Sequence, residues 1–153
     1  MKNESIDKAV LEFYEELPFN IYDDYKLASD KVIKQNVTNV YPVLKKVLQD
    51  YKIKSAIDVG CGTGWFINSL GYHEKHLNLT GLDFNKIATD FAENIAQRLK
   101  LRTNFITDSV FDYRPKSKFD LISSLGVLHH TRNCHEAIKC ICNLGNDNSI
   151  IFL

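Results

Sequence analysis

The stretch AIDVGCGTGWF, residues 56–66, decides the fold. A short apolar run ends at Gly60, and two further glycines follow at Gly62 and Gly64. An unbroken apolar run of this length is typical of a strand that is buried on both faces. The glycines carry no Cβ atoms, so a ligand could lie directly on the backbone after this strand. Asp58, two residues before the first glycine, places a carboxylate beside this loop.

Strands and helices alternate along the rest of the chain. Apolar runs predict four more strands: LTGLDF (79–84), TNFIT (103–107), FDLISSLG (119–126) and SIIFL (149–153). Helical spacing predicts helices at 65–73, from an N-cap at Asn85 to about Leu99, and at 134–144 with Gly145 as the C-cap residue. This alternation predicts a doubly wound, mostly parallel α/β sheet with helices on both faces. Ligands bind such sheets beyond the C-terminal ends of the strands.

Two segments precede the first strand. Residues 1–28 are predicted to form a helical or lid segment, and residues 29–153 the main domain. Apolar residues keep helical spacing from Ser29 to Tyr51, which predicts one long amphipathic helix that Pro42 kinks or splits. The aromatic stretch LPFNIY, residues 17–22, suits either a lid over a ligand or a packed extension.

Composition excludes several classes of protein. The 153 residues suit one domain, with 44% hydrophobic and 25% charged residues. The formal net charge is zero, so there is no strong field to attract nucleic acid or a membrane surface. No secretory leader or membrane-spanning run is apparent. The four cysteines (Cys61, Cys134, Cys140 and Cys142) show no paired framework, which predicts free thiols in the cytoplasm.

The glycine loop distinguishes between cofactor classes. A nucleoside triphosphate loop ends in Gly-Lys-Ser/Thr, whereas here Trp65 follows the glycines. A dinucleotide loop needs a third glycine at the position of Trp65, and Asp58 would repel a pyrophosphate. A cationic cofactor would be stabilised there. IDVGCGTGWF resembles the first motif of the class I S-adenosylmethionine-dependent methyltransferases, and the resemblance extends from about Ile57 to Leu153.

Later strand ends extend this resemblance. Asp83, at the end of the second strand, suits charge-assisted hydrogen bonds to ribose hydroxyls, a device that dinucleotide folds share. The resemblance implies that Asp108 and its neighbours contact adenine and that the backbone from Ser124 contacts the methionine part. The expected cofactor-binding residues are Asp58, Gly60, Cys61, Gly62, Gly64, Asp83, Phe84, Asp108, Ser109, Val110, Ser124, Leu125 and Gly126.

Two histidines follow the fourth strand in GVLHHT. His129 and His130 are candidates for a catalytic base or for holding an acceptor hydroxyl, and the alternative is that they cap or bridge the loop. No metal site is predicted, because the nearby Cys140 and Cys142 would diverge on a helix and no zinc spacing occurs.

The sequence thus predicts an S-adenosylmethionine-dependent methyltransferase with an unidentified, small-molecule acceptor. The alternatives are a non-catalytic S-adenosylmethionine-binding module and, less favoured, a nicotinamide-dependent oxidoreductase.

The number of strands raises a further expectation. The resembling family usually has seven strands, so a five-strand chain implies either a fragment that lacks the last two or another cover for the edge. We expect this chain to bind the cofactor but to methylate poorly. We also expect self-association through residues 149–153, which carry no charge or proline.

Overall fold

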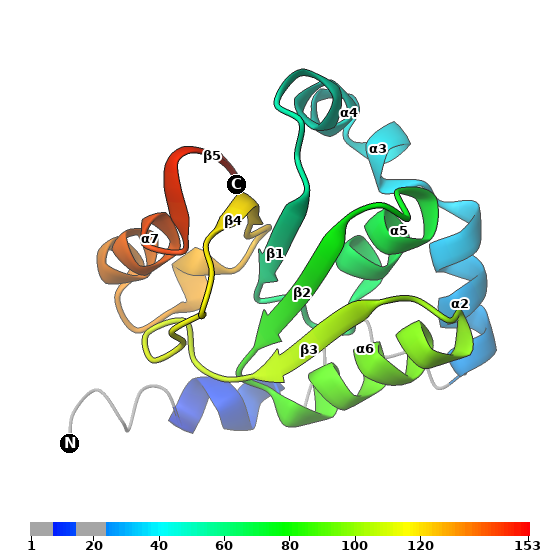
Figure 1. Ribbon diagram of the computed structural model, residues 1–153. Coiled ribbons are helices and arrows are strands. Elements are labelled where there is room, and N and C mark those ends of the chain that lie inside the picture. Colours follow the sequence, from blue (N-terminus) through cyan, green and yellow to red (C-terminus); the bar gives the residue numbers. More distant parts are fainter. Residues whose placement is uncertain (1–7, 15–23) are drawn as a thin grey trace.

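The protein is described by a computed structural model that covers residues 8–14 and 24–153. Five strands form one sheet in the order β3-β2-β1-β4-β5, and every pair is parallel (Figure 1). The strands are β1 (Ser55–Val59), β2 (Asn78–Asp83), β3 (Thr103–Thr107), β4 (Phe119–Ser123) and β5 (Gly145–Phe152). The predicted α/β class and the parallel sheet are therefore confirmed.

Helices cover both faces of the sheet, as Figure 1 shows. They are α2 (Tyr25–Lys34), α3 (Val37–Val40), α4 (Pro42–Asp50), α5 (Trp65–His73), α6 (Lys86–Arg98), the 3-10 helix η1 (Leu128–His130) and α7 (Cys134–Cys142). Residues 8–14 are also helical. Helices α2, α5 and α6 lie together on one face, and α7 lies on the other.

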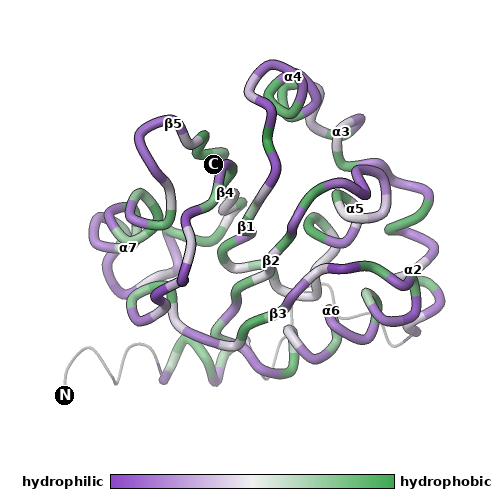
Figure 2. The backbone as a smooth tube through the Cα atoms, viewed as in Figure 1, coloured by the Kyte–Doolittle hydropathy of each residue, from purple (hydrophilic) through white to green (hydrophobic). Residues whose placement is uncertain are grey.

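Each face of the sheet has its own apolar core, which explains why the strands read as continuous apolar runs. In β1, Ala56 belongs to the cluster under α5, whereas Ile57 belongs to the cluster under α7. Ile67, Leu70, Leu121 and Ile122 are fully buried. Figure 2 shows the alternating hydropathy along α6 that buries one side of this helix and exposes the other.

The region before β1 differs from the single predicted helix. Pro42 is the first residue of α4, so the predicted split at this proline is confirmed. A second break separates α2 from α3, where the side chain of Asn36 accepts a hydrogen bond from the Thr38 amide and caps α3. Helical spacing continues across this break, which is why periodicity alone missed it. The predicted lid, residues 17–22, lies outside the described residues.

Two predicted boundaries fall inside single elements of the structure, β5 and α2. Gly145 is not a helix cap: α7 ends with Asn143 as its cap, and Gly145 is the first residue of β5, where it pairs with Phe119. A Cβ at Gly145 would lie 2.7 Å from the Ser149 Cβ, so close packing accounts for this glycine. The division at residues 28 and 29 stays a prediction, and α2 runs across it.

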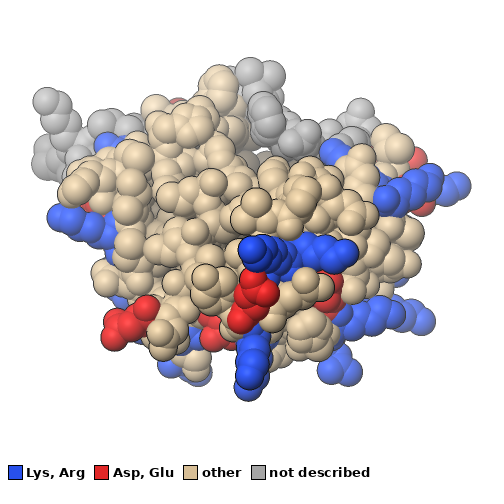
Figure 3. Space-filling view, turned by 90° about the horizontal axis from the view of Figure 1, so that it is seen from above, with Lys and Arg blue, Asp and Glu red and all other residues tan. Residues whose placement is uncertain are grey.

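The chain carries 19 basic and 19 acidic residues. Figure 3 shows basic side chains spread over one face with acidic ones among them. None of the helices in the described ranges is both long and apolar enough to cross a membrane. All four cysteines are free, as predicted.

Candidate functional site

A cavity of about 720 Å³ lies at the C-terminal ends of the strands. The strand order reverses between β1 and β4, which is the point where doubly wound sheets bind ligands. The predicted site residues that line this cavity are Asp58, Gly60, Cys61, Gly62, Asp83, Phe84, Asp108, Ser109, Val110, Leu125, Gly126, His129 and His130. Gly64 and Ser124 are not among its lining residues.

The glycine loop is fixed against the end of β2. The amides of Gly60 and Cys61 both donate to the Leu82 carbonyl, at 2.7 and 3.0 Å. Gly62 has a φ of +51°, and a Cβ built on it would meet no atom within 4 Å. Since Gly62 lines the cavity, that open space is available to a ligand. The loop therefore offers bare backbone to the cavity, as the sequence predicted.

Gly64 has a different role from Gly62. It has a φ of +77° and precedes α5 as its N-cap residue. A Cβ at this position would lie 2.6 Å from the Cβ of Ala92 in α6. This glycine allows two helices to approach each other, which is a packing requirement. Its predicted contact with a cofactor stays a prediction.

Asp83 joins the loop to the exit of β2. One carboxylate oxygen accepts from the Gly62 amide at 2.8 Å, and the other accepts from the Asn85 amide at 2.9 Å. The side chain is only 8% exposed, and burial raises its pKa. Asn85 caps α6 by accepting from the Ile87 and Ala88 amides, so Asp83 is not needed as a helix cap.

Asp58 is the second buried carboxylate of the cavity. It is 4% exposed, and the Ser123 hydroxyl donates to it at 2.8 Å. Burial, with a smaller contribution from the negative charge of Asp83, raises the pKa of Asp58 to about 7, although the hydrogen bond from Ser123 acts in the opposite direction. A positive charge in the cavity would reverse this effect by stabilising both ionised carboxylates. Ser124, by contrast, donates its hydroxyl to the Val59 carbonyl at 3.0 Å and ties β4 to β1.

The exits of β3 and β4 complete the cavity wall. The Asp108 amide donates to the Asp83 carbonyl at 3.0 Å, and the Asp108 carboxylate accepts from the Ser109 amide at 2.8 Å. His129 and His130 belong to η1, with ring centroids 3.9 Å apart, and both are exposed at the cavity. Neither histidine contributes to a group of three or more potential metal ligands, since the described residues contain no such group.

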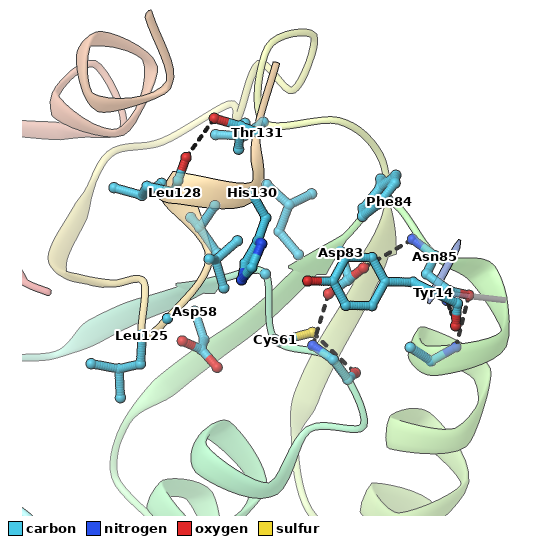
Figure 4. Close-up of a pocket in the computed structure, with 18 of the residues that line it drawn as sticks. Tyr14, Asp58, Cys61, Asp83, Phe84, Asn85, Leu125, Leu128, His130 and Thr131 are labelled. Carbon is cyan, nitrogen blue, oxygen red and sulfur yellow. Dashed lines mark hydrogen bonds between the residues drawn. The ribbon is translucent and has the colours of Figure 1, made fainter. Parts of the chain in front are cut away.

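Several aromatic residues in the cavity wall were not predicted as site residues. Tyr14, from the helix at residues 8–14, and Tyr41, between α3 and α4, both line it. Trp65 and Phe66, which begin α5 after the glycine loop, line it too. Figure 4 places Tyr14 over the side of the cavity that contains Asp83. No local pattern links Tyr14 to the glycine loop, because only the tertiary fold brings both to the same cavity.

Comparisons with known proteins agree with this geometry. The profile of a family described as "Methyltransferase domain" matches residues 50–153. A carboxy-S-adenosyl-L-methionine synthase of Nautilia profundicola is 30% identical over 111 residues, which cover 72% of this chain and 46% of that protein. A probable (S)-tetrahydroprotoberberine N-methyltransferase 2 of Papaver bracteatum is 27% identical over 101 residues, covering 65% of this chain and 28% of that protein.

Solved structures share the fold. The plantazolicin methyltransferase BpumL, in complex with a monoazolic desmethylPZN analog and SAH, has a TM-score of 0.66 at 18% identity, and the match covers 98% of this chain and 59% of that chain. The magnesium protoporphyrin IX methyltransferase of Synechocystis PCC 6803, with bound SAM, has a TM-score of 0.66 at 17% identity and covers 92% of this chain and 72% of its own.

The chain spans less than half the length of these two curated relatives. The family profile nevertheless matches about two thirds of this chain, including the glycine loop and every strand of the sheet. On this evidence, the chain belongs to the methyltransferase-domain family.

Proposed function

We propose that this domain binds S-adenosylmethionine and its product S-adenosylhomocysteine, and that it forms the methyl-donor site of a methyltransferase with a small-molecule acceptor. The observation that carries the proposal is the pair of buried carboxylates, Asp58 and Asp83, in one cavity beside a bare glycine loop. A cation relieves the cost of ionising both groups in a place of low dielectric.

The described residues fit this cofactor. Asp83 is already held by backbone amides, and a carboxylate has further lone pairs to accept ribose hydroxyls. The open space at Gly62 admits a ligand against the loop. Asp108, Ser109 and Val110 are the proposed adenine contacts, and Leu125 with Gly126 the proposed methionine contacts.

The bound sulfonium supplies an electrophilic methyl group, and its leaving group departs neutral, so no protein acid is required. The main task of the chain is then to orient donor and acceptor in line at close range. A base is needed only if the acceptor carries a proton that must be removed. His129 and His130 stay candidates for that role, because they lie at the exposed side of the cavity.

The related proteins support methyl-transfer chemistry without fixing the acceptor. Their names include an N-methyltransferase from Papaver bracteatum and a ubiquinone biosynthesis O-methyltransferase from Pelagibacter ubique, which is 24% identical over 127 residues. The acceptor atom of this protein is accordingly left open. The free cysteines support a reducing compartment, and we propose the cytoplasm.

Calorimetry distinguishes this proposal from the nicotinamide alternative. We expect S-adenosylhomocysteine to bind and NAD to bind weakly or not at all, because a pyrophosphate would face Asp58 and Asp83. Asp83→Ala should weaken S-adenosylhomocysteine binding about ten- to a hundredfold by removing charge-assisted contacts. Asp112→Ala, at an exposed aspartate of the turn after β3, is the matched control. Preferred binding of NAD, or unchanged affinity in a folded Asp83→Ala variant, would count against the proposal.

Turnover separates an enzyme from a non-catalytic binding module. Candidate acceptors would be screened with a donor that carries a labelled methyl group. Transfer of label to an acceptor supports the enzyme, whereas donor binding without transfer to any of them favours the module.

A further inference from the structure

Tyr14 bridges two strand exits that the sequence keeps far apart. Its ring meets the Phe84 ring edge-on, with centroids 6.4 Å apart and planes at 86°. On its other side it meets the His130 ring at 6.1 Å and 83°. Phe84 follows β2, and His130 ends η1 after β4. Figure 4 shows the Tyr14 ring between these residues and beside Asp83.

The backbone of this segment is also held at the rim of the cavity. The Asn85 side-chain amide donates to the Tyr14 carbonyl at 3.4 Å, while its oxygen caps α6. Val10, one turn earlier in the same helix, lines the cavity as well. In Figure 1 this helix, drawn in dark blue, crosses the end of the sheet where β2 and β3 finish. Helix 8–14 is thus attached next to the proposed ribose carboxylate.

The Asp83 carboxylate also acts electrostatically on the hydroxyl of Tyr14. Partial burial raises its pKa, and the charge of Asp83 adds to that increase. This agrees with the geometry, in which the phenol lies on the Asp83 side of the cavity.

We infer that Tyr14 is part of the binding site for the adenosyl portion of the methyl donor and that it slows release of the bound ligand. The inference rests on the proposed function. An aromatic ring joining the two exits excludes water from the cavity, and hydrogen bonds from a ligand to Asp83 are stronger in a drier site. A ligand held by Asp83 would also contact the Tyr14 ring beside that carboxylate, and it would have to break this contact on leaving the cavity.

The position of Tyr14 determines which ligands should bind more weakly when its ring is removed. It lies beside Asp83, at the proposed ribose end, and the adenosyl group is common to S-adenosylmethionine and S-adenosylhomocysteine. Removing the ring should therefore weaken both ligands to the same degree. A loss restricted to S-adenosylmethionine would instead indicate contact with the sulfonium and would overturn the assignment.

The test is binding kinetics of both ligands on wild-type protein and the variants Tyr14→Ala and Tyr14→Phe. Tyr14→Ala should raise Kd about tenfold, mostly through a faster dissociation rate. Tyr14→Phe keeps the ring and should stay within about threefold of wild type. Tyr25→Ala, which removes a tyrosine stacked on Phe91 outside the cavity, is the matched control and should bind normally.

The outcomes separate the two proposals. If wild-type protein binds neither ligand, the proposed function fails, and this inference with it. If wild type binds and Asp83→Ala weakens binding, but Tyr14→Ala binds with unchanged kinetics, the function stands and the role of Tyr14 is wrong. Melting temperatures of all variants check that lost binding does not reflect lost folding.

Discussion

At the scale of single residues, Asp58 combines two opposing properties. It is a carboxylate in the wall of a cavity, yet it is almost fully buried and has one hydroxyl donor, Ser123. An ionised group in this position is costly in the ligand-free protein. Its raised pKa of about 7 means that, between about pH 4 and pH 7, the folded protein holds a proton there which the unfolded chain, with an aspartate pKa near 3.8, does not.

We expect the ligand-free protein to lose stability as the pH rises from about 4 to about 7. In this window the native state binds more protons than the unfolded state, so the free energy of unfolding falls with increasing pH. Asp58→Asn keeps an acceptor for Ser123 but cannot ionise. It should flatten the pH dependence and gain on the order of 2 kcal/mol over wild type at pH 8.

Urea denaturation at pH 5 and pH 8 checks this expectation. Asp147→Asn, at an exposed residue, is the control and should follow wild type. Asp83 contributes in the same direction, because burial raises its pKa too, so some pH dependence should persist in Asp58→Asn. An Asp58→Asn variant that loses stability with pH as steeply as wild type would show that Asp58 is ionised in the free protein.

At the scale of elements, the glycine loop separates ligand binding from helix packing. Gly62 faces open space in the cavity, whereas Gly64 faces Ala92 of α6. Both have positive φ values, so alanine at either position adds about 1–2 kcal/mol of backbone strain. Only Gly64→Ala also forces α5 and α6 apart.

We therefore expect Gly64→Ala mainly to lose folding stability and Gly62→Ala mainly to lose ligand affinity. Gly64→Ala should lose about 2–4 kcal/mol of stability, since strain and overpacking add. Gly62→Ala should lose only the strain, yet bind S-adenosylhomocysteine at least about tenfold more weakly, because its Cβ enters the ligand space. Denaturation midpoints and calorimetry on both proteins measure the contrast. If Gly62→Ala binds normally, the loop does not contact the ligand.

The elements also show what the sequence could and could not predict. The apolar runs located every strand, because strands buried on both faces leave a continuous signal. The break at Asn36 was missed, since Ile33 and Val37 keep helical spacing across it. Motif spacing predicted 13 of the 28 described residues that line the cavity. It did not predict Tyr14, because two of its ring partners, Phe84 and His130, lie 70 and 116 residues away along the chain.

At the scale of the whole molecule, β5 forms one edge of the described sheet. It begins earlier than predicted and includes Asp147, and its pairing with β4 shifts register between Phe119 and Leu121. A charge and an irregular pairing discourage edge-to-edge association. The charge lies before Ile150, and the register shift ends there. From Ile150 to Phe152 the second half of the strand pairs regularly. Ile151 is 39% exposed, and Leu153, just after the strand, is 62% exposed.

We predict that this 153-residue chain associates with itself through the second half of β5. Sedimentation velocity over a range of concentrations should show reversible association, and Ile151→Lys should reduce it. Asn104→Lys, at an exposed residue of the opposite edge strand β3, is the matched control and should associate like wild type. A concentration-independent monomer for the wild-type chain would contradict this prediction.

The hydrogen bonds of Asp83 have a consequence for the entropy of binding. Its carboxylate orders the Gly62 and Asn85 amides before any ligand arrives, and the Leu82 carbonyl orders Gly60 and Cys61. Glycine-rich backbone has the most conformational freedom to lose. Here that freedom is lost when β1 and β2 pair during folding, so ligand binding does not have to order the loop again. The proposed adenosyl half of the cavity is therefore preorganised, and we expect its affinity to follow from contacts made by a loop that is already in place.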